Sequence, residues 1–182
     1  MMLNLISIGI WALQGIMAIV VLGLSVDLVK GQLLGDAPTT TKYGTFTGGF
    51  GLAVATLGLA SAFIDAIPAL VVMAADALSG VLLLGGGIVF AIGLHGVTCD
   101  PQTERESRTL LRNGLINGVT FDGDGEPFPH KDMTAGRLLD NCKKDTADQA
   151  MQFVTFGFAI ASIVLVFLVW KNGRGSRSGA YV

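Results

Sequence analysis

Asp76 is the residue of this 182-residue chain whose type and surroundings most suggest chemistry, because it stands inside a long apolar stretch. An aspartate in such a place can hold a proton or a ligand, or it can act as a hydrogen-bond pin between helices. The sequence supplies Gln14 as the best amide partner, with the hydroxyls of Ser79 and Thr56 as further candidates. No Lys or Arg lies at comparable depth to pair with Asp76, so the pin is the favoured interpretation.

The two cysteines, Cys99 and Cys142, flank a charged segment. An even pair at the two roots of an exported loop is typical of a disulfide formed in an oxidising compartment. The alternative is a pair of free thiols that face the cytosol in a molecule of the opposite orientation. Neither histidine stands at ligand spacing with a cysteine, so we expect no metal site.

Other reactive groups form no catalytic pattern. His95 and His130 lack an accompanying nucleophile signature, and no glycine loop precedes a Lys-Ser or Lys-Thr pair to cradle phosphate. The segment Asp122–Glu126 is similar to the start of a calcium-binding loop, but Pro127 and Met133 replace its required glycine and glutamate. We expect a solvated acidic turn there, no cofactor, and a protein that is not an enzyme.

Four apolar stretches must position these residues, and each is long enough to cross a bilayer. They cover residues 3–26, 43–64, 69–95 and 150–170. A hydrocarbon core about 30 Å thick needs roughly 20 apolar residues in a helix. We therefore predict an all-α membrane protein, a four-transmembrane-helix antiparallel bundle that forms a single domain over residues 1–182. The first stretch lacks a basic leader, which favours an uncleaved span over a signal peptide.

The charges are gathered in one segment. Hydrophobic residues make up 51% of the chain and charged residues 14%. Ten of the 14 acidic residues and seven of the 12 basic residues lie between Asp100 and Asp148, mostly in a long outer loop that we predict over residues 96–147. A nucleic acid would need a basic face, so we expect no nucleic-acid partner.

Helical spacing recurs inside the predicted outer loop. The sequence predicts a short surface helix around residues 105–112, because Arg105, Arg108 and Arg112 fall on one face. A second short helix is predicted from Met133 to Leu139. It would lead the chain back toward the membrane.

The last residues predict the orientation. Lys171, Arg174 and Arg177 follow the fourth stretch without any acidic residue, which places the tail at residues 171–182 in the cytoplasm by the positive-inside rule. Four spans put both termini on that side. The predicted interfacial anchors are Trp11, Tyr43 and Trp170.

Glycines punctuate the apolar stretches. No hydrophobic drive brings helices together in lipid, so small residues serve by letting two backbones approach closely. The glycines predicted to pack helices are Gly44, Gly48, Gly85, Gly86, Gly87 and Gly157. Packing within the bundle and contact between copies in a homo-oligomer are both open.

The placement of an aspartate and two cysteines carries a family resemblance. The run DAIPALVVMAADALSGVLLLGGGIVFAIGLHGVTC, from Asp65 to Cys99, is followed after the loop by NCKKDTADQAMQFVTFGFAIAS. The chain resembles the MARVEL domain of fungal plasma-membrane proteins related to non-classical export proteins. That family shares four spans, an aspartate early in span three and a cysteine at its outer end. The outer loop departs from the family by being longer and more charged.

The resemblance implies a function at the plasma membrane. It implies a non-enzymatic protein that organises lateral domains or curvature, with sterol- or sphingolipid-rich lipid and copies of itself as partners. The alternative is a small transporter or proton-linked channel built around Asp76. A transporter normally offers several polar groups along a path, inverted repeats or broken helices. The organiser is therefore the leading hypothesis.

Overall fold

The structure is a computed structural model that describes residues 2–32, 36–64, 66–117 and 134–177. The acidic turn expected at residues 122–126 lies outside the described residues. Within the described ranges every regular element is a helix. These are α1 (Met2–Lys30), α2 (Thr39–Ser61), α3 (Ala69–Gly93), α4 (Glu104–Arg112), α5 (Gly114–Asn117) and α6 (Ala135–Arg177).

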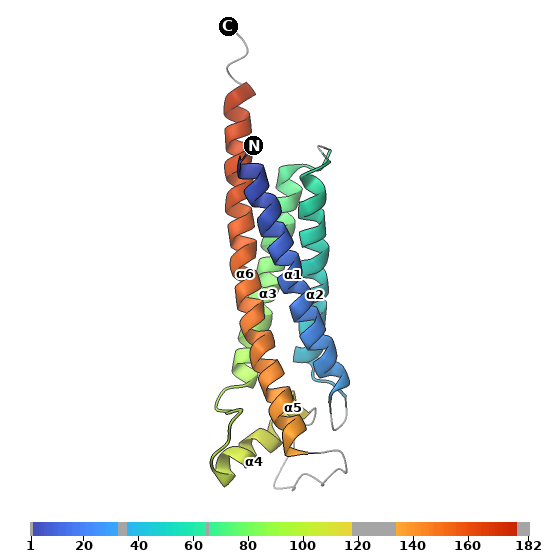
Figure 1. Cartoon of the computed structure of the whole chain (residues 1–182), viewed down its shortest axis with the longest axis vertical. Coiled ribbons are helices and arrows are strands. Elements are labelled where there is room, and N and C mark those ends of the chain that lie inside the picture. Colours follow the sequence, from blue (N-terminus) through green and yellow to red (C-terminus); the bar gives the residue numbers. More distant parts are fainter. Residues whose placement is uncertain (1, 33–35, 65, 118–133, 178–182) are drawn as a thin grey trace.

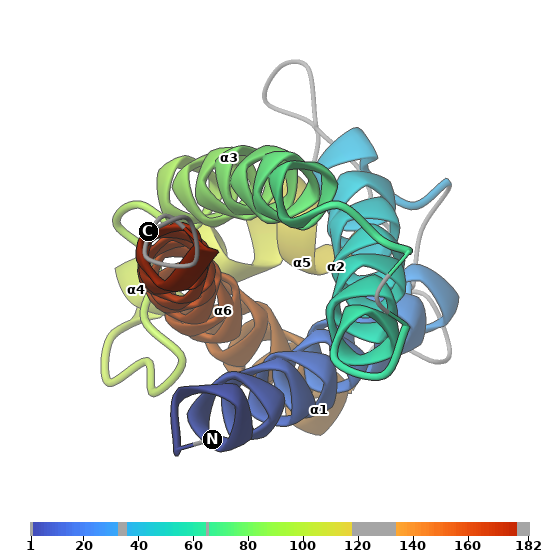
Figure 2. The ribbon, with the colours of Figure 1, turned by 90° about the horizontal axis from the view of Figure 1, so that it is seen from above.

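The four long helices form a ring in the order α1, α2, α3 and α6, as Figure 2 shows from above. Each long helix packs against the two beside it and runs antiparallel to both (Figure 1). Each is also long and apolar enough to cross a membrane. The predicted all-α, antiparallel four-span bundle is confirmed.

The two ends of the bundle differ. One end carries α4, α5 and the bond between Cys99 and Cys142, and we call it the disulfide end. At the opposite end α1 begins, α2 turns into α3, and α6 finishes; we call it the terminal end (Figure 1). The chain thus enters and leaves the bundle at the same end, as an even number of spans requires.

Helix α6 departs most from the sequence-based boundaries. It begins at Ala135 rather than at residue 150 and continues to Arg177. The short helix predicted from Met133 to Leu139 is therefore wrong as a separate element, because residues 135–139 form the first turns of α6. The segment between α3 and α6 is also not one long loop, since it contains α4 and α5. A search for apolar runs misses this start because the first turns of α6 are polar and pack against protein.

The outer surface of the ring suits a lipid environment. Each long helix carries large, exposed apolar side chains on the outer face of the ring. Examples are Leu5 of α1 (72% exposed), Phe46 of α2 (54%), Val81 of α3 (67%) and Val164 of α6 (51%). Such a surface is stable only where water is replaced by an apolar medium. The bundle therefore buries polar side chains together with part of its apolar ones, and its outer surface is apolar.

Close helix contacts use some of the predicted glycines. A Cβ added at Gly48 would lie 2.6 Å from the backbone nitrogen of Leu22, so α1 and α2 touch there through their backbones. A Cβ at Gly87 would lie 3.0 Å from the Phe153 ring, and Gly86 leaves room for the amide of Gln152. Gly44 similarly faces the side chains of Ser25, Phe90 and Asp148.

Two of the predicted packing glycines are open within the single chain. A Cβ at Gly157 would meet no atom within 4 Å, and one at Gly85 would meet only the Tyr43 hydroxyl, at 3.6 Å. Neither position is needed for a close approach between the helices of one bundle. Gly157 is therefore free for a contact of another kind.

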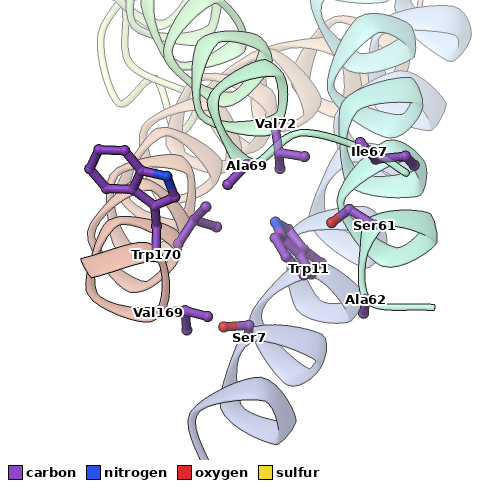
Figure 3. A pocket seen from close by; sticks show the side chains of 10 residues that line it. Ser7, Trp11, Ser61, Ala62, Ile67, Ala69, Val72, Val169 and Trp170 are labelled. Atoms are coloured by element: carbon purple, nitrogen blue, oxygen red, sulfur yellow. The ribbon is translucent and has the colours of Figure 1, made fainter. Parts of the chain in front are cut away.

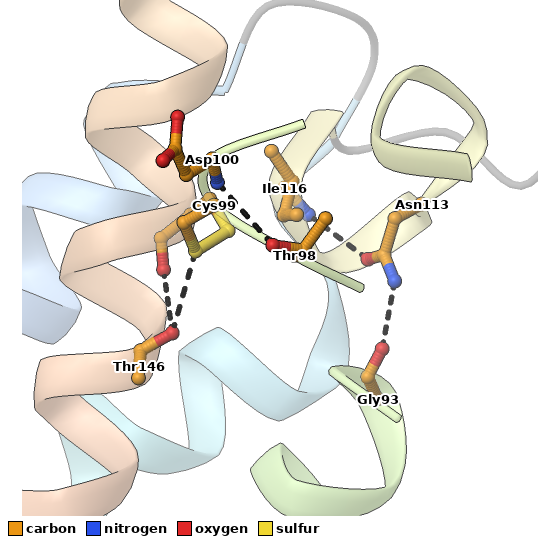
Figure 4. Close-up of a disulfide and its surroundings, with 8 residues drawn as sticks. Gly93, Thr98, Cys99, Asp100, Asn113, Ile116 and Thr146 are labelled. Atoms are coloured by element: carbon orange, nitrogen blue, oxygen red, sulfur yellow. Dashed lines mark hydrogen bonds between the residues drawn. A yellow bond between two sulfur atoms is a disulfide. The ribbon is translucent and has the colours of Figure 1, made fainter. Parts of the chain in front are cut away.

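The disulfide end is closed by covalent and hydrogen bonds (Figure 4). The predicted disulfide between Cys99 and Cys142 is present, with the two Cα atoms 5.6 Å apart. The Thr146 hydroxyl lies 3.6 Å from the Cys99 sulfur, and the Asn113 amide donates to the Gly93 carbonyl at 2.7 Å. These contacts tie α3, the segment around α5, and α6 together. The predicted surface helix is also confirmed, as α4.

Candidate functional site

Asp76 lies on α3, near the terminal end, and is fully buried. Its Oδ1 accepts a hydrogen bond from the Gln14 amide at 3.0 Å. Its Oδ2 accepts from the Ser162 hydroxyl at 2.5 Å and from the Trp11 indole at 3.5 Å. One carboxyl group therefore joins three helices, α1, α3 and α6. The arrangement satisfies both oxygens, as a buried carboxyl group requires.

The sequence identified only part of this network. Gln14 is confirmed as the amide partner, while the two hydroxyl candidates are wrong. Thr56 is turned outward and donates to its own helix at Leu52, and the Ser79 hydroxyl is buried but makes no hydrogen bond to Asp76. Ser162 was missed although it is a polar residue inside an apolar stretch, the same signal that singled out Asp76.

A cavity opens beside this network at the terminal end (Figure 3). Its volume is about 240 Å³, and Trp11 forms one wall. The lining is mostly apolar, with two hydroxyls: Ser7, Trp11, Ser61, Ala62, Ile67, Ala69, Val72, Val166, Val169 and Trp170. Its size and lining suit an apolar group such as part of a lipid chain. The Trp11 indole connects the cavity to Asp76 through its hydrogen bond.

The predicted interfacial aromatic residues have three different surroundings. Trp11 lies inside the bundle, with 5% of its side chain exposed, rather than on the outer surface. The Tyr43 hydroxyl donates to the Leu82 carbonyl at 3.1 Å and so links α2 to α3. Trp170 borders the cavity and lies next to the Phe167 ring, with centroids 6.1 Å apart.

A second buried polar layer lies nearer the disulfide end. Asp148 of α6 accepts a hydrogen bond at 2.5 Å from the Ser25 hydroxyl of α1, and both residues are fully buried. Asp145, one turn earlier on α6, is fully buried as well. Sequence reasoning missed this layer because it assigned Asp145 to the outer loop and left Asp148 at its edge. The usable signal was the spacing of three residues, which puts two carboxyl groups on one helix face.

These features define a class before any family is considered. The chain is a multi-pass helical membrane protein whose bundle is held by a buried aspartate near one end and by a disulfide at the other. Its sequence matches the MARVEL family model, described as a membrane-associating domain, over residues 4–165. The chain therefore belongs to the MARVEL family. A comparison with curated proteins found no match, and a comparison with solved structures also found none.

Proposed function

We propose that this protein is a non-enzymatic organiser of the plasma membrane, which acts by packing with lipids and with copies of itself. The observation that carries the proposal is the contrast between the fully paired Asp76 carboxyl group inside the bundle and the apolar exterior. Asp76 has donors on both oxygens, whereas large apolar side chains cover the outside of all four long helices. A protein built this way offers its outer surface to its surroundings.

The bonding of Asp76 supports a structural role over transport. A residue that carries protons or ions along a path must exchange its partners with water or substrate. Asp76 instead contacts Gln14, Ser162 and Trp11, all from neighbouring helices of the same bundle. We propose that it acts as the pin that fixes α1, α3 and α6 relative to one another.

The terminal end supplies the proposed lipid contact. The cavity bordered by Trp11, Val72 and Val166 is lined mainly by apolar side chains, and the hydroxyl groups of Ser7 and Ser61 add a polar part to its lining. A lipid chain could enter there, and a sterol hydroxyl or a sphingolipid amide could meet a serine at the rim. The basic residues Lys171, Arg174 and Arg177 favour this end as the cytoplasmic one.

The proposed contact between copies uses the open face of α6. Gly157 has no neighbour within 4 Å, and Ala161 follows one turn later, which is the small-residue spacing that brings helices together in lipid. Replacing Gly157 by Leu should therefore block a contact between copies without disturbing the single bundle. Gly9 on α1 is equally open but has Leu5 and Leu13 at the four-residue spacing, so it provides a matched control.

The test is a mass measurement of the protein extracted with its native lipid. We expect a defined homo-oligomer with retained sterol or sphingolipid, converted to smaller species by Gly157→Leu and unchanged by Gly9→Leu. A second measurement follows ion or proton flux through proteoliposomes, where we expect none above empty vesicles. A monomer with flux that disappears on Asp76→Asn would reject the organiser in favour of transport.

A further inference from the structure

The polar layer at the disulfide end is buried but unsatisfied. Neither carboxyl oxygen of Asp145 has a hydrogen-bond partner, and Asp148 has a partner only on Oδ2, from Ser25. The Thr41 hydroxyl of α2 is also buried and without a partner. The Gln152 amide lies beside Asp148 without reaching hydrogen-bond geometry. Buried polar atoms are nearly always paired, so a group of unpaired ones asks for an explanation.

The helix register places Thr41 and Asp145 at the same height in the bundle. Along α1 and α2, Ser25 faces Gly44, so Leu28 faces Thr41 one turn nearer the disulfide end. Along α1 and α6, Ser25 bonds to Asp148 and Gly31 bonds to Asn141, so Leu28 lies between them at the height of Asp145. A Cβ added at Gly44 of α2 would lie 3.3 Å from Oδ2 of Asp148 of α6, so Thr41 and Asp145, each one turn nearer the disulfide end, face the same part of the interior.

Among the residues that the structure describes, none supplies a positive charge to this layer. Within the described ranges, no Lys, Arg or His forms an ion pair with Asp145 or Asp148. The nearest lysine on α6, Lys144, is directed elsewhere and binds Asp27 and Asp140, each at 2.6 Å. Two ionised carboxylates in a buried site are strongly unfavourable without a counter-charge.

Apolar side chains also surround the carboxyl groups at this height. Leu28 and Phe90 are fully buried and form one cluster with Leu115. The carboxyl group of Asp145 thus cannot rely on solvent to balance its charge. A cation that several oxygen atoms coordinate would neutralise the carboxylates and give the unpaired oxygens a partner.

We propose that Asp145, Asp148 and Thr41 form a binding site for one hard divalent cation, Ca²⁺, within the helix bundle at the disulfide end. The unpaired oxygen atoms that we assign to the ion are both carboxyl oxygens of Asp145, Oδ1 of Asp148 and the Thr41 hydroxyl. Two carboxylates balance a double positive charge. Residues three apart on a helix have Cβ atoms about 5–6 Å apart, close enough for both carboxyl groups to reach one Ca²⁺ ion, whose oxygen ligands lie about 2.3–2.6 Å away.

The surrounding bonds hold these ligands in place. The disulfide anchors Cys142, three residues before Asp145, to the end of α3. Ser25 fixes Oδ2 of Asp148 and leaves Oδ1 for the ion. Ca²⁺ tolerates irregular oxygen shells, whereas Mg²⁺ requires a near-ideal octahedron, so a site made from fixed helices favours Ca²⁺.

The test measures thermal unfolding of the full chain in lipid nanodiscs, first with chelator and then with Ca²⁺ added. We expect the midpoint to rise with Ca²⁺ concentration, by roughly 3–6 °C at ten times the dissociation constant. Asp145→Asn should abolish the rise in midpoint. Asp148→Asn should weaken the apparent affinity for Ca²⁺ at least tenfold. Asp140→Asn, an exposed carboxylate on the same helix, should leave the rise unchanged.

A direct measurement keeps the proposal testable if a carboxyl variant does not fold. Binding of radioactive ⁴⁵Ca²⁺ to the wild-type protein should saturate at one ion per chain, and Thr41→Val should weaken it while preserving the fold. No binding and no midpoint shift would overturn the site, because the layer would then be two neutral carboxyl groups. Equal shifts with Mg²⁺, Na⁺ and Ca²⁺ at matched ionic strength, or a full shift in Asp145→Asn, would overturn it as well.

Discussion

The bundle buries carboxyl groups in two places and treats them in opposite ways. At the terminal end, Asp76 receives donors from Gln14, Ser162 and Trp11 and has no unpaired oxygen. At the disulfide end, Asp145 receives no hydrogen bond, and Asp148 receives one, from the Ser25 hydroxyl. A group that the protein satisfies by itself holds helices together. A group that the protein leaves without hydrogen bonds needs a ligand from outside the chain.

The strongest test of this comparison replaces Asp76 and Asp145 in two separate variants. Asp76→Leu leaves the buried donors of Gln14 and Trp11 without an acceptor, while the Ser162 hydroxyl keeps the Ala159 carbonyl. Each unpaired donor costs about 1–3 kcal/mol, so we expect a loss of roughly 2–6 kcal/mol in unfolding free energy. Without added Ca²⁺, Asp145→Leu removes an unpaired group and should leave stability unchanged or higher. Denaturant titration in nanodiscs measures both. Equal losses from the two variants would contradict the comparison.

Opening the disulfide tests the disulfide end alone. The bond joins residues separated by 43 positions, and a closure of that size stabilises by about 4 kcal/mol in the chain-entropy model. We expect the double variant Cys99→Ala, Cys142→Ala to lower the unfolding free energy by about that amount. It should also lower the affinity for Ca²⁺ while leaving the donors to Asp76 in place. Retained affinity would show that the bond does not position Asp145.

Single donors give a finer measure of the Asp76 pin. Gln14→Leu removes the one donor to Oδ1, and we expect a loss of about 1–3 kcal/mol. Ser79→Ala is the matched control, because that hydroxyl is equally buried on the same helix as Asp76 but makes no hydrogen bond. Its loss should be near zero. Urea unfolding of both variants in the same lipid decides whether Gln14 supports the pin.

The sequence was a good guide to the first layer and a poor guide to the second. Length and hydropathy predicted four spans, and depth within a span singled out Asp76 and its partner Gln14. The partner Ser162 depends on how α6 is rotated against α3, which no single-sequence pattern encodes. Trp11 was assigned to the interface because aromatic rings commonly lie there, whereas a glycine at position 58 lets it pack inside.

The second layer was missed for a different reason. Asp145 and Asp148 sit among charged residues, so the apolar run was taken to begin after them. Their burial becomes apparent only when α1 and α2 are placed against the first turns of α6. Charges that face protein and charges that face water look alike in a sequence. A helix that emerges from the membrane and continues through protein contacts is therefore easy to cut short.

The smallest effect concerns α4, which covers the disulfide end with Leu110 packed against Ile116 and Cys142. Backbone hydrogen bonds from Gln102 and then Thr103 lower the pKa of Glu106 below its ordinary value of 4.5. A lowered pKa means that this carboxylate stabilises α4 above pH 4.5, and that the contribution is lost as the pH falls through the folded-state pKa.

Acidification should therefore loosen α4 before it disturbs the bundle. We expect faster amide hydrogen exchange in the first turn of α4 as the pH falls below about 4.5, after correction for the intrinsic rate. Glu106→Ala should exchange at the faster rate at every pH, because it also removes the side-chain half of the capping box with Thr103. Exchange in α4 that is independent of pH would show that this carboxylate does not hold the cover. The cover would then depend on the apolar contacts of Leu110 with Ile116 and Cys142.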